Sequence, residues 1–316
     1  MLAFSFAVFL AIALVGIYKQ GFGRFVDTLT SLNPWYFLSA LVIIFVSYSI
    51  RYPKWSMYLR RLGVRIGTWR NFVIYMSMYS MDITPGRWGR AIVSYTINQL
   101  SNVKFAVTFP AVVTDIFTDF LGFAVVADAM AIIVDRFVLL SLFLTFLLMV
   151  PFIFVYIEGP FVFVSRIHKR WKRRFGALKR LDVVFDTARF YFKYNKRLGA
   201  SSFVYSMAIT IPSMMLNGLA LYVVMAGFGV PMTPGQIPVV LFIFSSSLVL
   251  GMVTGIPGTL GVTDAALIGQ LQYFYPGTIG LGLASAITIV FRIATVWFVQ
   301  LFGFSAFVYT LKYWKN

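Results

Sequence analysis

The stretches Pro85-Gly86-Arg87-Trp88-Gly89 and Pro257-Gly258-Thr259-Leu260-Gly261, the first and the second break, decide the fold of this 316-residue chain. They share the pattern Pro-Gly-x-x-Gly, lie 172 residues apart, and each interrupts an apolar stretch. A broken helix at membrane depth is tolerated only where protein or a water-filled cavity satisfies the freed backbone groups. Interrupted apolar segments in both halves of a chain are typical of the substrate site in inverted-repeat transporters. The two breaks therefore predict a transporter-like membrane protein.

The composition places the chain in a bilayer. Hydrophobic residues make up 60% of it and charged residues 12%, and the mean hydropathy is +0.84. A soluble protein of this length could not hide so much apolar surface. Eighteen of the 27 Lys and Arg residues lie in two stretches, 51–70 and 166–197, which the positive-inside rule assigns to the cytoplasm. There they would face anionic headgroups, so the net charge of +17 does not point to nucleic acid.

The reactive side chains argue against an enzyme. The chain has no cysteine, which excludes disulfides, thiol catalysis and cysteine-ligated metals. Its single histidine, His168, stands among basic residues of a loop, so neither a multi-histidine metal site nor a histidine-based triad is expected. We expect no cofactor and no metal.

The apolar runs predict an all-α polytopic membrane protein with about six transmembrane helices plus two re-entrant helical hairpins in an inverted-repeat arrangement. Residues 1–157 form the first membrane half, with a re-entrant hairpin at 72–100. Residues 158–199 form a basic amphipathic cytoplasmic linker. Residues 200–316 form the second membrane half, with a re-entrant hairpin at 239–275. The expected spans are 2–18, 35–50, 105–127, 137–157, 201–228 and 279–304.

Charge parity gives the two halves opposite orientations. The first half would run as an inward span, a hairpin from inside and an outward span, and the second half reverses each direction. Both termini are then cytoplasmic, and a prokaryotic cell membrane is the expected location. The segment 239–255 is also long enough to cross completely, so the second hairpin and a full span both stay open.

The chemistry of each break favours an anion. Proline fixes φ and removes an N–H group, and glycine permits positive φ, so one half-helix ends and another begins. The new helix N-terminus attracts anions through its free N–H groups and its dipole. Arg87 and Arg90 lie three residues apart on one helical face and suit a phosphate. The structural alternative is a tight interfacial turn whose arginines reach water.

Ionisable residues inside spans are costly and usually face a cavity or a partner. Asp115 and Asp119 share a helix face, and Arg292 stands alone in an apolar stretch. A structural ion-pair network and a polar pathway for a headgroup or a coupling proton both account for them. Asp264, in the second hairpin, either caps backbone groups or faces the cavity. The candidate substrate-binding residues are Pro85, Gly86, Arg87, Gly89, Arg90, Asp115, Asp119, Pro257, Gly258, Gly261, Asp264 and Arg292.

These motifs, in this order, resemble the transmembrane flippase-like domain of lysylphosphatidylglycerol synthases and its stand-alone relatives, over about residues 34–309. Pro85, Gly86 and Gly89 fit that family's first break, although Arg90 stands where an acidic residue is common. Asp115 and Asp119 fit a Glu-Arg-x-x-Asp-like element in which Ile116 replaces the arginine. In the second break Thr259 replaces a glycine and Asp264 stands for a glutamate, and Arg292 fits the last element. The resemblance implies a family that moves charged phospholipids between leaflets, here without the synthase domain.

The leading functional hypothesis is a flippase or scramblase-like carrier of a phospholipid or another phosphate-bearing lipid. Arg87 and Arg90 would hold the phosphate, and the aspartates would hold a cationic headgroup or orient the arginines. The alternative is a non-transporting lipid-binding module or an accessory subunit of a lipid-modifying or glycosyltransferase system. An intramembrane enzyme using Asp115 and Asp119 is least favoured. The expected partners are membrane lipids, phospholipid or polyprenyl-phosphate-linked, and no nucleic acid; the sequence is compatible with a homo-oligomer.

Overall fold

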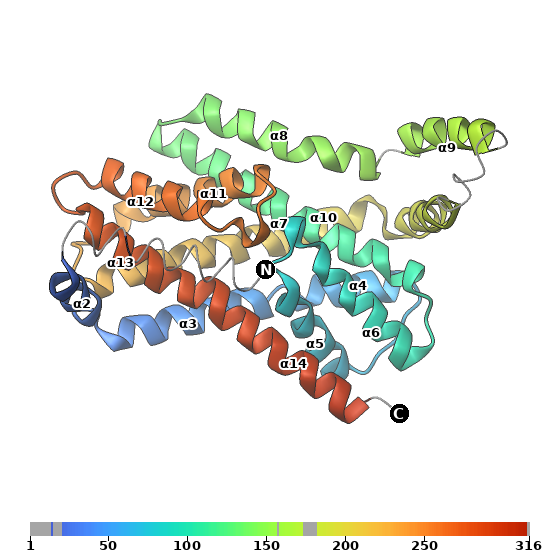
Figure 1. Ribbon diagram of the computed structural model, residues 1–316, viewed down its shortest axis with the longest axis horizontal. Coiled ribbons are helices and arrows are strands. Elements are labelled where there is room, and N and C mark those ends of the chain that lie inside the picture. Colours follow the sequence, from blue (N-terminus) through green and yellow to red (C-terminus); the bar gives the residue numbers. More distant parts are fainter. Residues whose placement is uncertain (1–13, 15–20, 157, 173–181, 315–316) are drawn as a thin grey trace.

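The computed structural model of this protein describes residues 14, 21–156, 158–172 and 182–314, and all regular structure in these residues is helical. Figure 1 shows most helices running along the long axis of the molecule. Within the described residues, five helical segments are long and apolar enough to cross a membrane: Pro34–Arg61, Phe105–Val134, Tyr191–Gly227, Pro234–Val253 and Leu281–Trp314. The expected all-α polytopic membrane fold is confirmed. The number of crossings, the re-entrant character of the hairpins and the division into two halves and a linker stay predictions.

The first part of the chain folds into helices that enclose the first break. Asn33 begins one of them by accepting a hydrogen bond from Trp35 N at 3.0 Å, and Pro34 stands at its first position. The elements are α2 (Phe22–Thr30), α3 (Pro34–Ser49), α4 (Tyr52–Arg61), α5 (Thr68–Ser77), η1 (Met78–Met81), η2 (Pro85–Ala91), α6 (Ile92–Ser101), α7 (Phe105–Val134) and α8 (Val138–Tyr156).

The second part of the chain encloses the second break. Its long helix α10 bends at Gly199, whose φ of 67° and ψ of 164° are not helical. The elements are α9 (Glu158–Lys172), α10 (Asp182–Gly227), η4 (Pro234–Gln236), α11 (Ile237–Val253), η5 (Pro257–Thr259), α12 (Val262–Phe274), α13 (Leu281–Arg292), the π-helix η6 (Ile293–Trp297) and α14 (Phe298–Trp314).

Two helical hairpins approach each other tip to tip. Figure 1 shows α5 and α6 in one half of the molecule and α11 and α12 in the other, with the breaks near the middle. The tips touch, because a Cβ placed on Gly258 would lie 3.0 Å from Ile83 Cγ1. This arrangement brings the two breaks, far apart in sequence, to one place.

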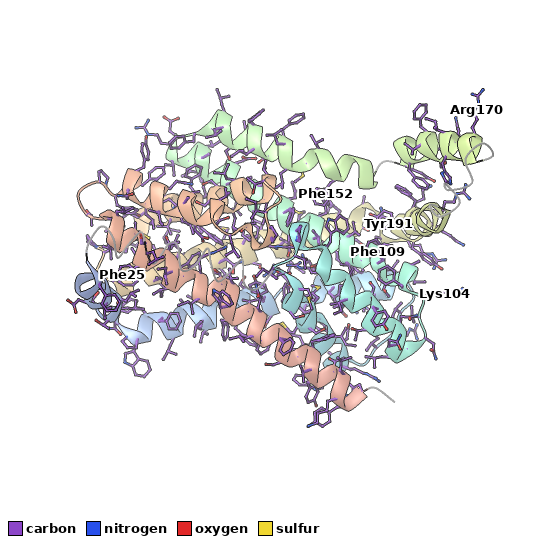
Figure 2. The ribbon with its side chains drawn as sticks, viewed as in Figure 1. Phe25, Lys104, Phe109, Phe152, Arg170 and Tyr191 are labelled. Atoms are coloured by element: carbon purple, nitrogen blue, oxygen red, sulfur yellow. The ribbon has the colours of Figure 1, made fainter. Side chains whose placement is uncertain are left out.

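The core follows α7, whose inward face is buried along most of its length. α7 packs against both α10 and α11, and α10 packs against α3. At one end of the molecule Phe25 packs against Ala286 and Ile289, and at the other Phe109 meets Tyr191 with ring centroids 6.2 Å apart (Figure 2). These contacts form two small hydrophobic clusters beside the main core.

The basic stretch 51–70 was expected to be a loop, and this prediction is wrong for its first part. The chain continues there as α4, and Arg51 and Lys54 are buried. They point to carboxylates of α7, whereas the basic side chains of a cytoplasmic loop would point to water. The expected first span, 2–18, lies outside the described residues apart from Leu14.

Candidate functional site

The two breaks share one backbone conformation at the two residues after the proline and differ beyond them, where Leu260 is extended and Gly261 has φ of 85°. Gly86 and Arg87 have φ of 58° and 59°, and Gly258 and Thr259 have φ of 63° and 57°. Arg87 N donates to Thr84 O at 2.9 Å, and Thr259 N donates to Ile256 O at the same distance. Two consecutive left-handed residues therefore follow the Pro in each break. Holding arginine and threonine in this region costs roughly 1–2 kcal/mol each, because their Cβ atoms crowd the backbone.

Arg90 joins the first break to α7. Its Nη1 donates to Asp115 Oδ2 at 2.8 Å and to Asp119 Oδ2 at 2.9 Å. On its other side, Nη2 donates to Asp82 Oδ2 at 2.7 Å, and Nε donates to Asp82 Oδ1. The guanidinium is fully buried. Its Nε and Nη2 form a bidentate pair with Asp82, and its Nη1 donates to both Asp115 and Asp119.

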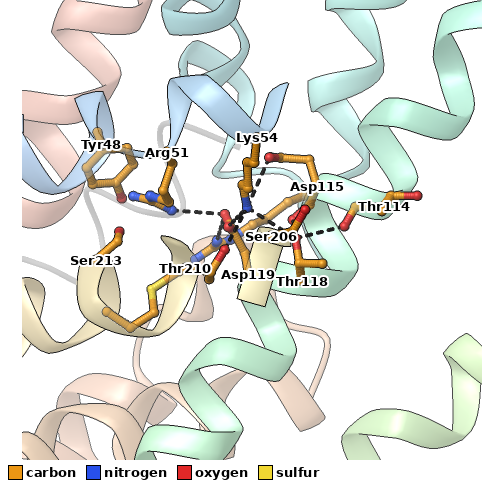
Figure 3. Close-up of polar contacts among 12 residues, drawn as sticks. Tyr48, Arg51, Lys54, Thr114, Asp115, Thr118, Asp119, Ser206, Thr210 and Ser213 are labelled. Atoms are coloured by element: carbon orange, nitrogen blue, oxygen red, sulfur yellow. Dashed lines mark hydrogen bonds and ion pairs between the residues drawn. The ribbon is translucent and has the colours of Figure 1, made fainter. Parts of the chain in front are cut away.

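Two further cations, Arg51 and Lys54 of α4, contact the carboxylates of α7 (Figure 3). Arg51 Nη1 lies 3.0 Å from Asp119 Oδ2. Lys54 Nζ lies 2.6 Å from Asp119 Oδ1 and 3.1 Å from Asp115 Oδ1. It also donates to Thr118 Oγ1 at 3.1 Å and to Thr210 Oγ1 at 3.2 Å, which ties α4 to α7 and α10.

Arg51 and Lys54 are not among the site residues predicted from the sequence. The signal that could have found them is their spacing of three residues immediately after an apolar helix, which places both on one helical face. We call the seven charged residues together the ion cluster: Arg51, Lys54, Asp82, Arg87, Arg90, Asp115 and Asp119.

The ion cluster carries one excess positive charge when every group is ionised, since four cations face three carboxylates. Arg87 is its loosest member. Arg87 Nη1 lies 3.6 Å from Asp119 Oδ2, and Arg87 Nε lies 3.9 Å from Asp82 Oδ2, both beyond hydrogen-bond length. Its side chain is 14% exposed, whereas those of Arg90, Asp115 and Asp119 are fully buried. The excess charge is therefore presented at Arg87.

The second break holds a matching pair with the charges exchanged. Arg292 Nε lies 2.7 Å from Asp264 Oδ1, and Arg292 Nη2 donates to Gly258 O at 3.1 Å. Asp264 Oδ2 accepts from Gly261 N at 2.8 Å and so caps α12. In the first break the hairpin supplies the arginine and the following long helix the aspartate. In the second break the hairpin supplies the aspartate and the following helix the arginine.

A cavity of about 70 Å³ lies between the breaks. The residues that matter for its chemistry are Arg87, Arg292, Asp82, Asn217, Phe120 and Phe123, all of which line it. Asn217 Oδ1 is buried without a hydrogen-bond partner, which makes it available to a ligand. Thr295 and Val296 of the π-helix also line the cavity, and such helix irregularities are common at functional sites. The cavity has room for several water molecules, and so for a phosphate-sized group.

The structure separates the predicted site residues into three groups. Gly86, Arg87, Gly258 and Arg292 line the cavity. Arg90, Asp115, Asp119 and Asp264 lie behind it and do not line it. The remaining predicted residues shape the backbone of the breaks: Pro85, Gly89, Pro257 and Gly261. Gly89 is closely packed, because a Cβ there would lie 2.6 Å from Thr84 Cγ2.

Comparison with known proteins agrees with this architecture. Residues 2–303 match the lysylphosphatidylglycerol synthase TM region. Two UPF0104 membrane proteins of Methanothermobacter thermautotrophicus are similar along nearly their whole length. One is 23% identical over 92% of this chain and 89% of its own length, and the other is 24% identical over 96% and 91%. The chain is an integral membrane protein, and it belongs to the lysylphosphatidylglycerol synthase TM region family.

Proposed function

We propose that the protein moves a phosphate-bearing lipid between the leaflets of a prokaryotic cell membrane, as a flippase or scramblase-like carrier. The observation that carries this proposal is the cavity between the two breaks, with Arg87 and Arg292 on its wall. Two half-helix tips that meet around a charged cavity resemble the substrate sites of inverted-repeat transporters. Family membership supports a membrane function and is compatible with a lipid cargo.

In this mechanism the phosphate enters the cavity and Arg87 supplies the uncompensated positive charge. Arg87 can turn toward a ligand because its contacts to Asp82 and Asp119 are longer than hydrogen bonds. Arg90, Arg51 and Lys54 fix the carboxylates behind it, so the first break keeps its shape when the ligand arrives or leaves. Access alternates when the hairpin tips, which touch at Ile83 and Gly258, move apart. Acyl chains stay in the bilayer throughout.

The test is transbilayer movement in liposomes that contain the purified protein. The lipids carry a fluorophore on one acyl chain, and an impermeant quencher reports the outer leaflet. We expect movement of at least one phospholipid with the wild type, and a loss of about tenfold or more in Arg87→Gln, which corresponds to ~1.4 kcal/mol.

The matched control is Arg65→Gln, which also removes one arginine charge but at an exposed position outside the ion cluster. This variant should retain the wild-type rate. Equal rates for wild type, Arg87→Gln and protein-free liposomes would refute transport. Movement by wild type that survives in Arg87→Gln would refute the assignment of the site.

A further inference from the structure

Beside each break an arginine lines the cavity, and all of the neighbouring carboxylates except Asp82 lie behind it. Resting on the proposed function, we propose that the cavity selects an anionic phosphodiester lipid whose headgroup carries no ammonium group. Cationic and zwitterionic lipids are then poor ligands. The proposal depends on which cation-binding groups of the site are already engaged within the protein.

The buried aspartates are engaged. Asp115 and Asp119 have no exposed side-chain surface, and each contacts both Lys54 and Arg90 within 3.1 Å. Asp264 is 1% exposed and divides its two oxygens between Arg292 and Gly261 N. A lipid ammonium group could reach these carboxylates only by displacing an internal cation.

Asp82 is the one carboxylate among the described residues that line the cavity. Both of its oxygens accept hydrogen bonds from the fork of Arg90. Such a bidentate pair is among the stronger polar contacts in proteins, and here it is largely buried. Asp82 therefore does not provide a free negative charge to a headgroup.

Three of the four aromatic rings that line the cavity already lie against a cation, and the fourth, Phe244, packs edge-to-face against Phe123 and Phe291. The guanidinium of Arg87 lies 5.3 Å from the ring centre of Phe120 and 5.9 Å from that of Phe123. The guanidinium of Arg51 lies 4.1 Å from the ring centre of Tyr48, which also lines the cavity. Ring faces are the usual sites for a quaternary ammonium group such as choline. These three rings already have an internal cation.

The charge that remains is positive. The pair Arg292 and Asp264 is neutral, and the ion cluster has one excess positive charge, presented by Arg87. A phosphodiester carries one negative charge and two oxygens that can accept from a guanidinium. An added ammonium group would meet the uncompensated charge of Arg87 in a space of about 70 Å³. Like charges at that range repel, and the buried setting screens them weakly.

The experiment measures lipid binding and lipid movement separately. Binding of phosphatidylglycerol, phosphatidylcholine and lysylphosphatidylglycerol to the detergent-purified protein is measured by native mass spectrometry. Movement of the same lipids is measured in liposomes of matched composition. We expect phosphatidylglycerol to bind and to move at least about tenfold better than either of the others. Arg87→Gln should reduce this ratio toward one, Arg87→Lys should largely preserve it, and Arg65→Gln should leave it unchanged.

The outcomes separate the two proposals. Preferential binding of phosphatidylglycerol without movement of any lipid would support the selectivity and refute transport. Equal or tighter binding of phosphatidylcholine or lysylphosphatidylglycerol would overturn the selectivity, whether or not lipid moves. Inorganic phosphate that binds and displaces phosphatidylglycerol at equal concentration would assign the cavity to a soluble anion and overturn the lipid assignment. Arg87→Lys, which keeps the charge, shows whether a changed ratio in Arg87→Gln reflects charge or folding.

Discussion

Arg87 lies in the first break and Arg90 directly follows it, yet their surroundings give them different tasks. Arg90 is fully buried and hydrogen-bonded to Asp82, Asp115 and Asp119. Arg87 is partly exposed at the cavity and has only longer contacts to carboxylates. Arg90 therefore holds the break in place, and Arg87 is available to a ligand.

This difference predicts that substitution of Arg90 mainly lowers stability, whereas substitution of Arg87 mainly lowers function. Arg90→Gln should lower the free energy of unfolding by about 3 kcal/mol or more, because it leaves buried carboxylates without their partner. Arg87→Gln should lower it by less than about 1 kcal/mol, because loose ion pairs contribute little. Thermal unfolding of both variants in detergent micelles measures the difference. Equal losses of stability would contradict the separate tasks, as would a larger loss in Arg87→Gln.

The sequence predicted part of the ion cluster but not Arg51 and Lys54, and there is a physical reason why these two were missed. Asp115, Asp119 and Arg292 stood out because a charge inside an apolar helix requires compensation. Arg51 and Lys54 follow an apolar run, where basic residues usually mark a cytoplasmic loop. That rule uses the sign of the charge and its place in the sequence, not the direction of the side chain. Because the chain continues as α4 against α7, the two cations point inward.

Among the elements, the hairpins agree more closely with the sequence than the long helices do. The expected first hairpin, 72–100, falls on α5 with η1, on η2 and on α6, and its re-entrant character stays a prediction. The expected last span, 279–304, is one apolar run in the sequence but contains the π-helix Ile293–Trp297. A π-helix has one extra residue in a turn, and the spacing of apolar residues does not reveal it here because all sides of this helix are apolar. Arg292 at the start of this π-helix is therefore placed by tertiary packing.

α14 depends on a close approach to the first hairpin at Gly303. A Cβ on Gly303 would lie 2.5 Å from Ser80 N and 2.9 Å from Tyr79 C, which are backbone atoms of η1 and cannot turn aside. Gly303→Ala should therefore push α14 off η1 and destabilise the protein by about 1–3 kcal/mol.

The control for this prediction is Gly269→Ala in α12. A Cβ there meets nothing within 4 Å. Alanine should stabilise this helix by roughly 0.5–1 kcal/mol, because glycine is costly inside a helix. Unfolding midpoints of both variants in one detergent give the comparison. A Gly303→Ala midpoint at or above that of the wild type would show that α14 is not in close contact with η1.

At the scale of the molecule, the long helices α3, α7 and α10 pack along extended faces, whereas the two hairpin tips share only a small contact. Ser47 and Ser213 join α3 to α10 by donating to each other's carbonyl oxygens at 2.9 Å. The hairpin tips instead meet over a few residues near Ile83 and Gly258. Small contacts separate at lower cost than long packed faces, because less buried apolar surface is exposed. The tips are therefore the parts we expect to move during transport.

Because the chain has no cysteine, crosslinks can test this movement directly. In Ile83→Cys/Gly258→Cys, the Cβ of residue 258 lies 3.0 Å from the Ile83 Cγ1 position, within reach of a disulfide. We expect oxidation to stop lipid movement in liposomes and reduction to restore it. The matched pair Ser47→Cys/Ser213→Cys replaces oxygens 3.1 Å apart between α3 and α10, and its crosslink should leave movement unchanged. Movement that persists with the tips fully crosslinked would show that they do not separate. A block by the crosslink between α3 and α10 would show that whole halves move instead.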